Sequence, residues 1–534
     1  MRDCGNKGAD TLCRNGSKGT ACPWCLPPFF SAEALAAARR DFSWKRLPHA
    51  LRSGSRPIRR ASCLVTVCLL LSTAGCPPAE NQRVQERVRQ GGAVRLAVAG
   101  DPAMAAAIEQ LEGEWKAQTN IDLRVDRIPE AELSQGKMPQ ADALICPAYC
   151  LGPLAFAGHV GVIPQQSLEE DRENWADIFS TLWLDEGAWA SRVTAVPFGS
   201  PVLVCYYRPD LLEKLHREPP RTWAQYQEVA VLASDRTKLG AAAPPADKPW
   251  SGAIEPLGPG WAGLTLLARA AGYATHPDNY STLFNIDTMK PLVDGPPFVR
   301  ALDELVAAAK TATPDELTYD PAAVRGAFWL GRCALAITWP TAADKSVSAE
   351  PGFPVGFAEL PGSADVYDPA RGRWEPRREG KEVHVALLDV AGRLGLLHSA
   401  TSRPAESLRL LLWLSGRKWS PQVCAASPAT TLFRQSHLTN PKAWVERPVS
   451  ARAAAEYAQQ TAKTLSGQPR LFALRIPGRA EYLAALDTAV QEAVRARKPS
   501  QDALRDAAAA WNKVTDRLGR RSQQRAYWAS LGLE

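Results

Sequence analysis

The chain has 534 residues, with 63 Lys and Arg against 56 Asp and Glu, and a formal net charge of +7. Residues 1–60 hold twelve basic and four acidic side chains, a surplus that exceeds the charge of the whole chain, so the remainder sums to about −1. This balance excludes the broad basic surface that nucleic-acid binding requires. The length exceeds that of a usual single domain.

Residues 1–60 carry four cysteines within 22 positions, two of them in a Cys-Pro-Trp-Cys motif that is typical of zinc or redox sites. These cysteines are Cys4, Cys13, Cys22 and Cys25. The flanking sequence has no periodicity that predicts a folded module. We therefore expect residues 1–60 to be an unstructured leader, or to lie upstream of the true start of the protein.

An apolar run over 61–75 follows Arg59 and Arg60 and ends at Cys76. About 15 apolar residues are too few for the roughly 20 that a spanning helix needs, so residues 61–76 are interpreted as a secretion signal. The small residues before the cysteine resemble the lipobox of bacterial lipoproteins, which implies lipidation of Cys76. Thr73 stands where lipoboxes prefer Leu, and ordinary cleavage that leaves a free periplasmic protein is the second hypothesis. Both hypotheses place the working chain outside the cytoplasm.

Beyond a polar tether at residues 77–90, strands alternate with helices. The predicted elements are a strand over 94–100, a helix over 104–118, strands over 121–125 and 142–146, and a helix over 151–157. Ile108, Leu111 and Trp115 stand at helical spacing in the first helix. This alternation predicts an α/β fold with a parallel sheet wrapped by helices.

The same alternation continues beyond residue 196. The segments are a strand over 197–207, helices over 210–215, 264–271, 298–310 and 405–414, a turn and strand over 328–339, a strand over 355–362 and an apolar run over 383–388. Thr222 and Gln225 make a capping box for one more helix. The last third is mostly helical. Trp223, Trp329 and Trp511 are expected in the core.

Apart from Cys76, five cysteines follow the signal, and this odd number predicts no disulfide framework. Two of them, Cys146 and Cys150, flank a predicted turn and could form one local bridge. Two free thiols beside a turn are an equally good interpretation.

Several landmarks resemble the family-1 extracellular solute-binding proteins of bacterial ABC importers, the class that includes the maltodextrin-binding proteins. In order, they are Gly100-Asp101, Pro139–Asp142, Val196-Pro197, Tyr206-Tyr207, Asp210–Leu212, Pro220–Trp223, Ala270–Tyr273, Gly331–Ile337 and Leu360–Gly362. The resemblance spans about residues 91–520. Arg208 replaces the usual Asn after the tyrosine pair. The segment over 363–380 is longer than usual and is either a hairpin at the cleft rim or a surface loop.

This resemblance implies a periplasmic-binding-protein-like α/β fold with two lobes, a hinge and a ligand cleft between the lobes. Lobe 1 is expected at 91–198 plus 383–415, and lobe 2 at 199–362 plus 416–534. The partners implied are a mono- or oligosaccharide, the permease subunits of an ABC importer and, through the anchor, a membrane. We expect a monomer that needs no cofactor, no metal and no nucleic acid.

Candidate ligand-binding residues follow from strand ends and from the resemblance. Sugars offer apolar C–H faces ringed by hydroxyl groups, so a sugar site combines aromatic platforms with a few hydrogen-bonding groups. The candidates are Asp101, Tyr149, Phe198, Ser200, Trp261 and Trp339. Asp101 follows a strand at the edge where α/β sheets bind ligands, and it is equally well placed to cap the next helix. Phe198 and Ser200 lie at the expected hinge.

A catalytic role has little support in this sequence. Residues 258–263 satisfy Gly-x-Gly-x-x-Gly, but Pro259 is awkward in that turn and no clear strand precedes it. A pair of catalytic carboxylates for glycoside cleavage is kept as an alternative hypothesis, because two such groups need not be close in sequence. The same fold could also hold a non-sugar ligand (a polyamine, a phosphate ester, or a ferric ion suggested by Tyr206-Tyr207), or serve in a sensor lipoprotein that does not transport.

Overall fold

The computed structural model describes residues 92–342, 349–377, 381–467 and 469–533. The signal segment, Cys76 and the tether lie outside these residues. Within the described part, no helix is both long and apolar enough to cross a membrane.

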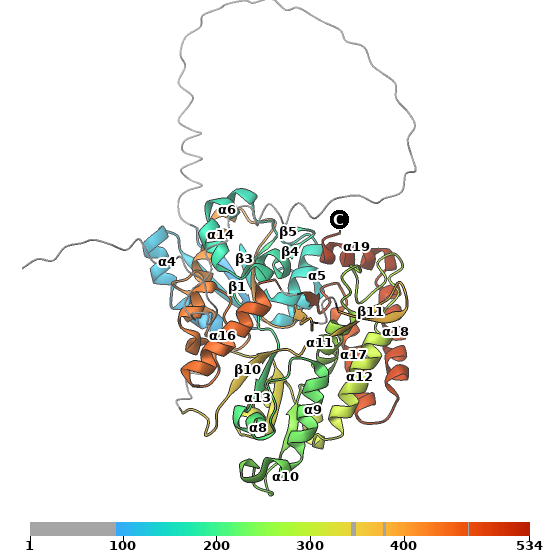
Figure 1. Cartoon of the computed structure of the whole chain (residues 1–534). Coiled ribbons are helices and arrows are strands. Elements are labelled where there is room, and N and C mark those ends of the chain that lie inside the picture. Colours follow the sequence, from blue (N-terminus) through green and yellow to red (C-terminus); the bar gives the residue numbers. More distant parts are fainter. Residues whose placement is uncertain (1–91, 343–348, 378–380, 468, 534) are drawn as a thin grey trace, which may run out of the picture. The chain divides into compact units, whose positions relative to one another are not determined.

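A five-stranded mixed sheet forms the core of the first lobe (Figure 1). Its strands, in spatial order, are β2 (Leu123–Ile128), β1 (Val94–Ala99), β3 (Ala143–Pro147), β14 (Arg393–Leu397) and β6 (Ala195–Pro197). β1 runs parallel to β2 and β3, whereas β14 runs antiparallel to both of its neighbours. The predicted parallel sheet is therefore confirmed for its first three strands.

Both faces of this sheet are covered, because the side chains of a strand point alternately to its two sides. Leu96 and Val98 lie in one apolar cluster with α3 (Pro102–Glu109) and α4 (Glu112–Thr119). Ala97 and Ala99 face the opposite cluster with η1 (Glu130–Gln135) and α5 (Leu151–Phe156). α14 (Pro404–Ser415) packs against β3, β6 and β14.

The predicted helix over 104–118 is two helices. The Leu111 amide donates to the Ile108 carbonyl at 2.9 Å, a three-residue spacing that tightens the chain between α3 and α4. The tightening turns Leu111 inward, where it joins Trp115 in the core.

A four-stranded sheet forms the core of the second lobe (Figure 1). Its order is β10 (Gly356–Glu359), β7 (Val204–Tyr207), β9 (Cys333–Thr338) and β8 (Ser251–Ile254). β8 is parallel to β9, and the remaining pairs are antiparallel. α9 (Trp223–Ser234) and α11 (Ala262–Ala274) lie in the apolar cluster of one face, and α13 (Pro321–Trp329) and α16 (Ala451–Leu465) in that of the opposite face.

The local predictions for this lobe are confirmed. Thr222 caps α9 by accepting from the Gln225 amide at 3.2 Å, and the Gln225 side chain reaches back in a capping box. Trp223 and Trp329 are buried, as the periodicity predicts.

Four helices build the C-terminal layer: α12 (Pro296–Ala309), α17 (Arg479–Val494), α18 (Ser500–Arg517) and α19 (Arg520–Leu531). Trp511 of α18 is fully buried, and its indole nitrogen donates to the Tyr482 carbonyl of α17 at 2.7 Å. The Phe284 ring lies 4.9 Å from that of Trp511, tilted by 33°, and 5.7 Å from that of Tyr482 in an edge-on contact. The aromatic contact therefore fixes the packing of α17 on α18.

The long segment after Gly362 forms a hairpin, β11 (Asp365–Asp368) with β12 (Arg373–Pro376). The hairpin packs on α11 through Trp374, whose ring lies 5.9 Å from that of Tyr273. Arg377 is buried and donates to two carbonyls at the end of α11. This segment is therefore ordered and attached to the second lobe.

Among the described residues, two of the segments that cross between the lobes lie side by side: residues 198–203 from β6 to β7, and residues 389–392 from β13 (Ala386–Leu388) to β14. β13 pairs in parallel with β15 (Arg470–Phe472). Gly199 and Gly392 adopt φ values of 111° and 97°, where residues with a side chain are strained. A Cβ at Gly392 would lie 2.6 Å from the Ser200 hydroxyl, so the two crossing segments touch.

Shorter elements connect these parts. They are η2 (Ala148–Cys150), α6 (Gln165–Glu170), α7 (Arg172–Asp177), η3 (Thr181–Glu186), β4 (Ala188–Trp189), β5 (Arg192–Val193), α8 (Pro209–Lys214), α10 (Arg236–Leu239), η4 (Gly240–Ala242), η5 (Pro314–Thr318), α15 (Ser420–Val423), η7 (Gln435–Thr439) and η8 (Pro441–Trp444). α15 contacts α3, so the chain beyond residue 416 stays on the first lobe and crosses to the second lobe only before α16.

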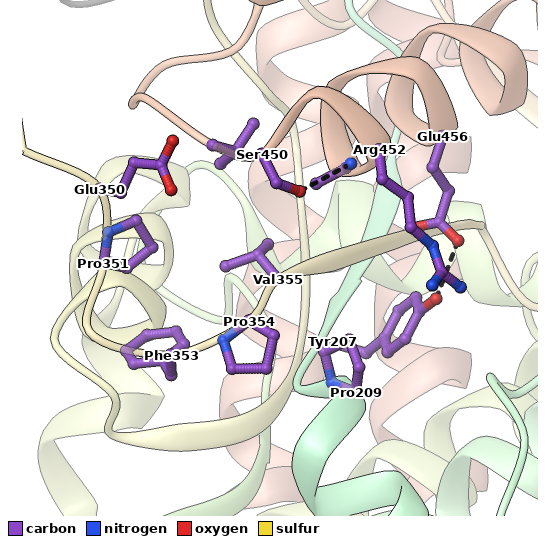
Figure 2. A pocket seen from close by; sticks show the side chains of 12 residues that line it. Tyr207, Pro209, Glu350, Pro351, Phe353, Pro354, Val355, Ser450, Arg452 and Glu456 are labelled. Atoms are coloured by element: carbon purple, nitrogen blue, oxygen red, sulfur yellow. Dashed lines mark hydrogen bonds between the residues drawn. The ribbon is translucent and has the colours of Figure 1, made fainter.

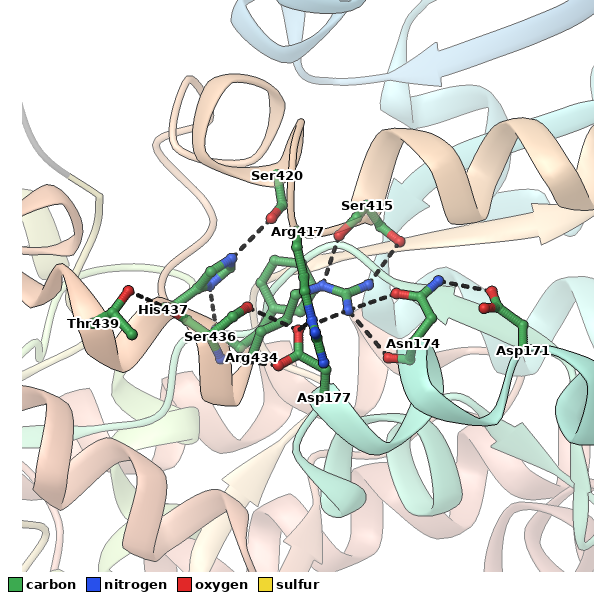
Figure 3. Close-up of polar contacts among 11 residues, drawn as sticks. Asp171, Asn174, Asp177, Ser415, Arg417, Ser420, Arg434, Ser436, His437 and Thr439 are labelled. Atoms are coloured by element: carbon green, nitrogen blue, oxygen red, sulfur yellow. Dashed lines mark hydrogen bonds and ion pairs between the residues drawn. The ribbon is translucent and has the colours of Figure 1, made fainter. Parts of the chain in front are cut away.

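A buried polar joint holds this part of the chain (Figure 3). The Arg434 guanidinium, which has no exposed surface, donates to the Ser415 carbonyl at 2.7 Å and to the Asn174 side chain at 2.8 Å. It also lies 3.2 Å from the Asp177 carboxylate. Burial raises the pKa of Asp177, but hydrogen bonds from Ser436 and Arg434 outweigh it and hold that pKa below its usual value. The ion pair of Arg434 with Asp177 thus connects α7, the end of α14 and η7.

Arg434→Met should lower the free energy of unfolding by about 3 kcal/mol or more, because it removes the buried partner of Asp177. The matched control is Arg417→Met. Arg417 contacts the same carboxylate at 3.2 Å, but its side chain is 59% exposed, so its loss should cost less than about 1 kcal/mol. Urea unfolding of both variants measures the difference. An equal loss of unfolding free energy in Arg434→Met and Arg417→Met would contradict the role assigned to Arg434.

Candidate ligand-binding cavity

A cavity of about 490 Å³ lies between η1 and α5 of the first lobe and the beginning of α17. Its walls are Leu133, Gly136, Tyr149, Cys150, Pro153, Phe156 and Ala157 on one side, and Pro477, Gly478, Arg479, Ala480, Glu481 and Leu518 on the opposite side. The size and the mainly apolar lining, with a few polar groups, are those of small-molecule sites.

Tyr149 and Arg479 contact each other in the wall of this cavity. Tyr149 follows β3, at the end of the strand where open α/β sheets bind ligands. The Arg479 guanidinium lies 4.3 Å from the centre of the Tyr149 ring, a cation–π contact. Nη2 of Arg479 donates to the Asp389 carbonyl at 3.1 Å. Burial lowers the pKa of Arg479 to about 10. The aromatic face that could receive a sugar is therefore partly covered by a cation.

A buried polar cluster lies behind Arg479, where the crossing segments meet. Glu186 Oε1 accepts from the Ser200 hydroxyl at 2.8 Å and from the Asp389 amide at 3.1 Å. Arg475 donates to the Glu186 carbonyl at 3.0 Å and lies 3.6 Å from the Asp389 carboxylate. Among the described residues, neither oxygen of the Asp389 carboxylate has a hydrogen-bond donor.

The two acids of this cluster have raised pKa values. Burial, together with the nearby Asp389 charge, raises the pKa of Glu186 to about 8. Burial likewise raises the pKa of Asp389 to about 6, against the opposing charges of Arg475 and Arg479. Burial thus disfavours the charged form of both acids, and the charges of Arg475 and Arg479 offset part of this cost at Asp389.

Asp101 is occupied by internal partners. One carboxylate oxygen accepts from the Met104 amide at 3.0 Å and caps α3, as one of the two predicted roles requires. The second oxygen pairs with Arg393 at 3.0 Å and accepts from Ser427. Asp101 thus links β1 to β14.

Trp261 and Trp339 are brought together, with ring centres 5.2 Å apart. Trp339 is buried, and its indole nitrogen has no hydrogen-bond acceptor among the described residues. Asp487 of α17 holds the loop of Trp261 by accepting from the amides of Gly260 and Gly263, both at 2.6 Å. Eight residues of helix, a rise of roughly 12 Å along α17, separate Arg479 at the cavity wall from Asp487, which holds the loop of Trp261.

The remaining candidates lie deeper in the fold. Phe198 has no exposed surface and packs against Gly395 of β14. Ser200 is buried in the polar cluster described above. Of the six predicted residues, only Tyr149 lines the cavity in this conformation.

Sequence reasoning missed Glu186, Asp389, Arg475 and Arg479. Arg475 and Arg479 bracket an Ile-Pro-Gly turn directly before an apolar helix, and this signal could have drawn attention to them. No motif in the sequence around Asp389 indicates its role. Its left-handed backbone conformation, with φ of 60°, is visible only in the structure.

Cys146 and Cys150 are both free and buried, which decides between the two interpretations of this pair. Burial raises the pKa of the Cys146 thiol, and the neighbouring Cys150 adds to that rise. Cys150 contributes to the wall of the cavity.

A second, smaller cavity of about 220 Å³ lies beside β10, at the start of α16 (Figure 2). The Tyr207 hydroxyl there donates to Glu456 at 2.9 Å, and the second Glu456 oxygen accepts from the Phe357 amide of β10 at 3.0 Å. Glu456 thus covers the free edge of the second sheet, and its contacts are those of a structural residue.

His276, Asp368 and Glu375 also bring possible metal-ligating atoms within 4.8 Å of one another. Both carboxylates are already paired with Arg371, at 3.3 and 3.2 Å. His276 Nδ1 accepts from the Asp278 amide, so the neutral ring carries its proton on Nε2, the atom that faces Glu375. These groups are arranged as an ion-pair network of the hairpin.

The model of a family described as bacterial extracellular solute-binding protein matches residues 98–372. Among solved structures, a solute-binding protein from Agrobacterium radiobacter K84, in complex with ribitol, is 20% identical, with a TM-score of 0.57 over 79% of this chain and 99% of its own. The sugar-binding protein MalE from Xanthomonas citri is 16% identical, with a TM-score of 0.59 over 80% and 98%. Comparison with curated proteins gives no match. The likenesses to solved structures show the fold, in which two α/β lobes are joined by a hinge.

Glu186→Gln should make the protein progressively more stable than the wild type as the pH rises from 5 to 8. An unfolded Glu titrates near 4.3, whereas folded Glu186 titrates at about 8. Between these values the unfolded chain has lost a proton that the folded chain keeps, so wild-type stability falls by up to about 1.4 kcal/mol per pH unit. Gln keeps the acceptor oxygen and removes the titration.

Thermal unfolding from pH 5 to 9 measures this effect. Glu114→Gln, at an exposed position of α4, is the control and should shift stability equally at every pH. A constant difference between wild type and Glu186→Gln across this range would contradict the raised pKa.

Proposed function

Because the chain belongs to the family of bacterial extracellular solute-binding proteins, we propose that it is a lipoprotein that captures a carbohydrate and delivers it to an ABC importer. The observation that carries this proposal is the 490 Å³ cavity between the first lobe and the start of α17. A cavity in this place lets a ligand contact both lobes at once, which is how binding stabilises a closed form.

The ligands of similar structures support the choice of carbohydrate. Ribitol, maltose, α-D-tagatose and maltotetraose are the molecules bound in four of them. In this chain, Tyr149 supplies an apolar platform in the cavity wall, and Trp261 and Trp339 form an aromatic pair at the loop that α17 holds.

We propose a hinge at residues 198–203 and 389–392. Relative to the expected division into 91–198 plus 383–415 and 199–362 plus 416–534, this hinge assigns β13 to lobe 2, where it pairs with β15 and contacts α11. The membership of the two sheets supports this division. The contacts of α15 and Arg434 place part of the segment over 416–450 beside the first lobe. Ligand shifts the equilibrium towards the closed form by contacts that the open form lacks.

The delivery role rests on export and on a monomer tethered by Cys76 to the membrane that holds the permease.

Cys76→Ser should move the protein from the membrane fraction to the soluble extracytoplasmic fraction, because the thiol that accepts lipid is lost. Cys63→Ser, in the same apolar run, is the control and should stay with the membrane. Unchanged partition of Cys76→Ser would rule out the anchor.

A thermal-shift screen of the purified protein tests the ligand class. Mono- and oligosaccharides should raise the melting temperature, and chromatography should recover the sugar chemically unchanged. If only amines, phosphate esters or metal ions stabilise the protein, the carbohydrate assignment is wrong. Recovery of a cleaved sugar would point to an enzyme.

Trp261→Ala and Tyr149→Ala should each weaken binding of a stabilising sugar about tenfold, since an aromatic platform is lost. Trp374→Ala removes a 36% exposed ring of the hairpin and serves as the matched control. Isothermal titration calorimetry measures the affinities, and circular dichroism checks folding. Unchanged affinity in both site variants would discard this site.

A further inference from the structure

One positive charge beside the cavity has no carboxylate of its own. Three of the four arginines in this region form ion pairs: Arg393 with Asp101, Arg470 with Asp185, and Arg475 with Asp389. Among the described residues, no carboxylate lies within 4.0 Å of the fourth, Arg479. Its only hydrogen bond there is from Nη2 to the Asp389 carbonyl, and its Nε is buried without a partner.

The acids near the cavity are held away from Arg479 or by other arginines. Asp389 acts on Arg479 electrostatically, but its carboxylate lies 3.6 Å from Arg475. Glu481 lines the cavity but forms an ion pair with Arg517. Glu130 acts on Arg479 electrostatically from beyond ion-pair distance. Among the described residues of the wall, Arg479 is therefore a cation without a carboxylate at ion-pair distance.

The start of α17 adds to this positive potential. Residues 477–481 line the cavity, and the helix cap Gly478 contributes no side-chain acceptor to the first turn. A helix N-terminus carries a partial positive charge and attracts anions. Arg479 is the first residue of this 16-residue helix, so its guanidinium and the helix dipole act at the same place.

Packing holds the guanidinium in position before any ligand arrives. The Tyr149 ring supports one face, and the Asp389 carbonyl fixes one nitrogen. An arginine has five N–H donors in a planar fork that matches a carboxylate. A neutral ligand would displace water from the Arg479 guanidinium without supplying a negatively charged acceptor in its place. This loss of hydration is costly in a mainly apolar cavity.

We propose that the ligand is a carbohydrate that bears a carboxylate, such as a hexuronate, and that Arg479 binds the carboxylate while the apolar walls contact the sugar ring. This inference rests on the proposed carbohydrate-binding function and narrows its substrate class. A single unpaired cation suits a monovalent carboxylate better than a phosphate dianion, for which the region offers no second free guanidinium among the described residues.

Calorimetry on the full chain at low salt tests the inference with matched sugar pairs: glucuronate against glucose, and galacturonate against galactose, together with the corresponding disaccharides. At least one acid should bind tenfold or more tightly than its neutral partner. Its affinity should fall as NaCl is raised, since salt screens the charge. Acetate and inorganic phosphate, the anions alone, should bind far more weakly.

Arg479→Gln should abolish the preference for the acid over its neutral partner, and this ratio of the two affinities is the quantity that tests the inference. Arg479→Lys keeps the charge but not the fork and should retain part of the preference. The matched control is Arg495→Gln, at the exposed far end of the same helix. Circular dichroism checks each variant, and Arg479→Lys provides the test if the Gln variant does not fold.

The outcomes separate this inference from the function on which it rests. If neutral sugars bind as tightly as acids, or if Arg479→Gln keeps the preference, the acidic substrate class is wrong and the carbohydrate receptor stands. If acetate or phosphate binds as tightly as a uronate, the site is a general anion site and the inference is overturned. If no sugar of either kind binds, the proposed function itself fails.

Discussion

The arrangement of both lobes depends on keeping charged groups paired where two crossing segments meet in a dry interior. Ser200 comes from the first crossing and Asp389 from the second, and both bind Glu186 Oε1. Buried acids are tolerated only when they are paired or protonated. Here Asp389 faces Arg475, and burial beside Asp389 raises the pKa of Glu186, which favours its neutral form. The hinge is thus held by a few directional polar contacts, and such contacts can be exchanged during a motion more readily than a packed apolar core.

The sequence predicts the local parts of this fold well, because their causes lie within a few residues. The capping box of Thr222 and Gln225, the strand over 94–100 and the buried Trp511 follow from spacing alone. The cavity wall does not follow in this way. Arg393 and Asp101 are 292 residues apart, and Tyr149 meets Arg479 only after α17 has packed on the second lobe. Pairings of this kind depend on tertiary packing, and one sequence gives no direct sign of them.

The predicted site residues also show why aromatic content alone is a poor guide. Phe198 and Trp339 are needed inside the fold, and Trp261 lies on its partner ring. Tyr149 lines the cavity, yet a guanidinium covers its face. An aromatic ring in a predicted loop therefore marks either a ligand platform or a packing site. The charges of the neighbouring residues distinguish a ligand platform from a packing site, and they indicate what kind of ligand the platform can bind.

α19 adds a constraint on how the lobes can separate. Its Trp528 indole and Gln524 amide donate to the Ile286 carbonyl of the second lobe, each at 2.9 Å. One residue further along the helix, the Ala529 carbonyl accepts from the Ala190 amide of the β4–β5 turn in the first lobe at 3.0 Å. If the lobes separate, one of these two sets of contacts must break. The contacts of α19 with the second lobe include the Trp528 indole, the Gln524 amide and Arg520, so α19 should move with the second lobe and release Ala190.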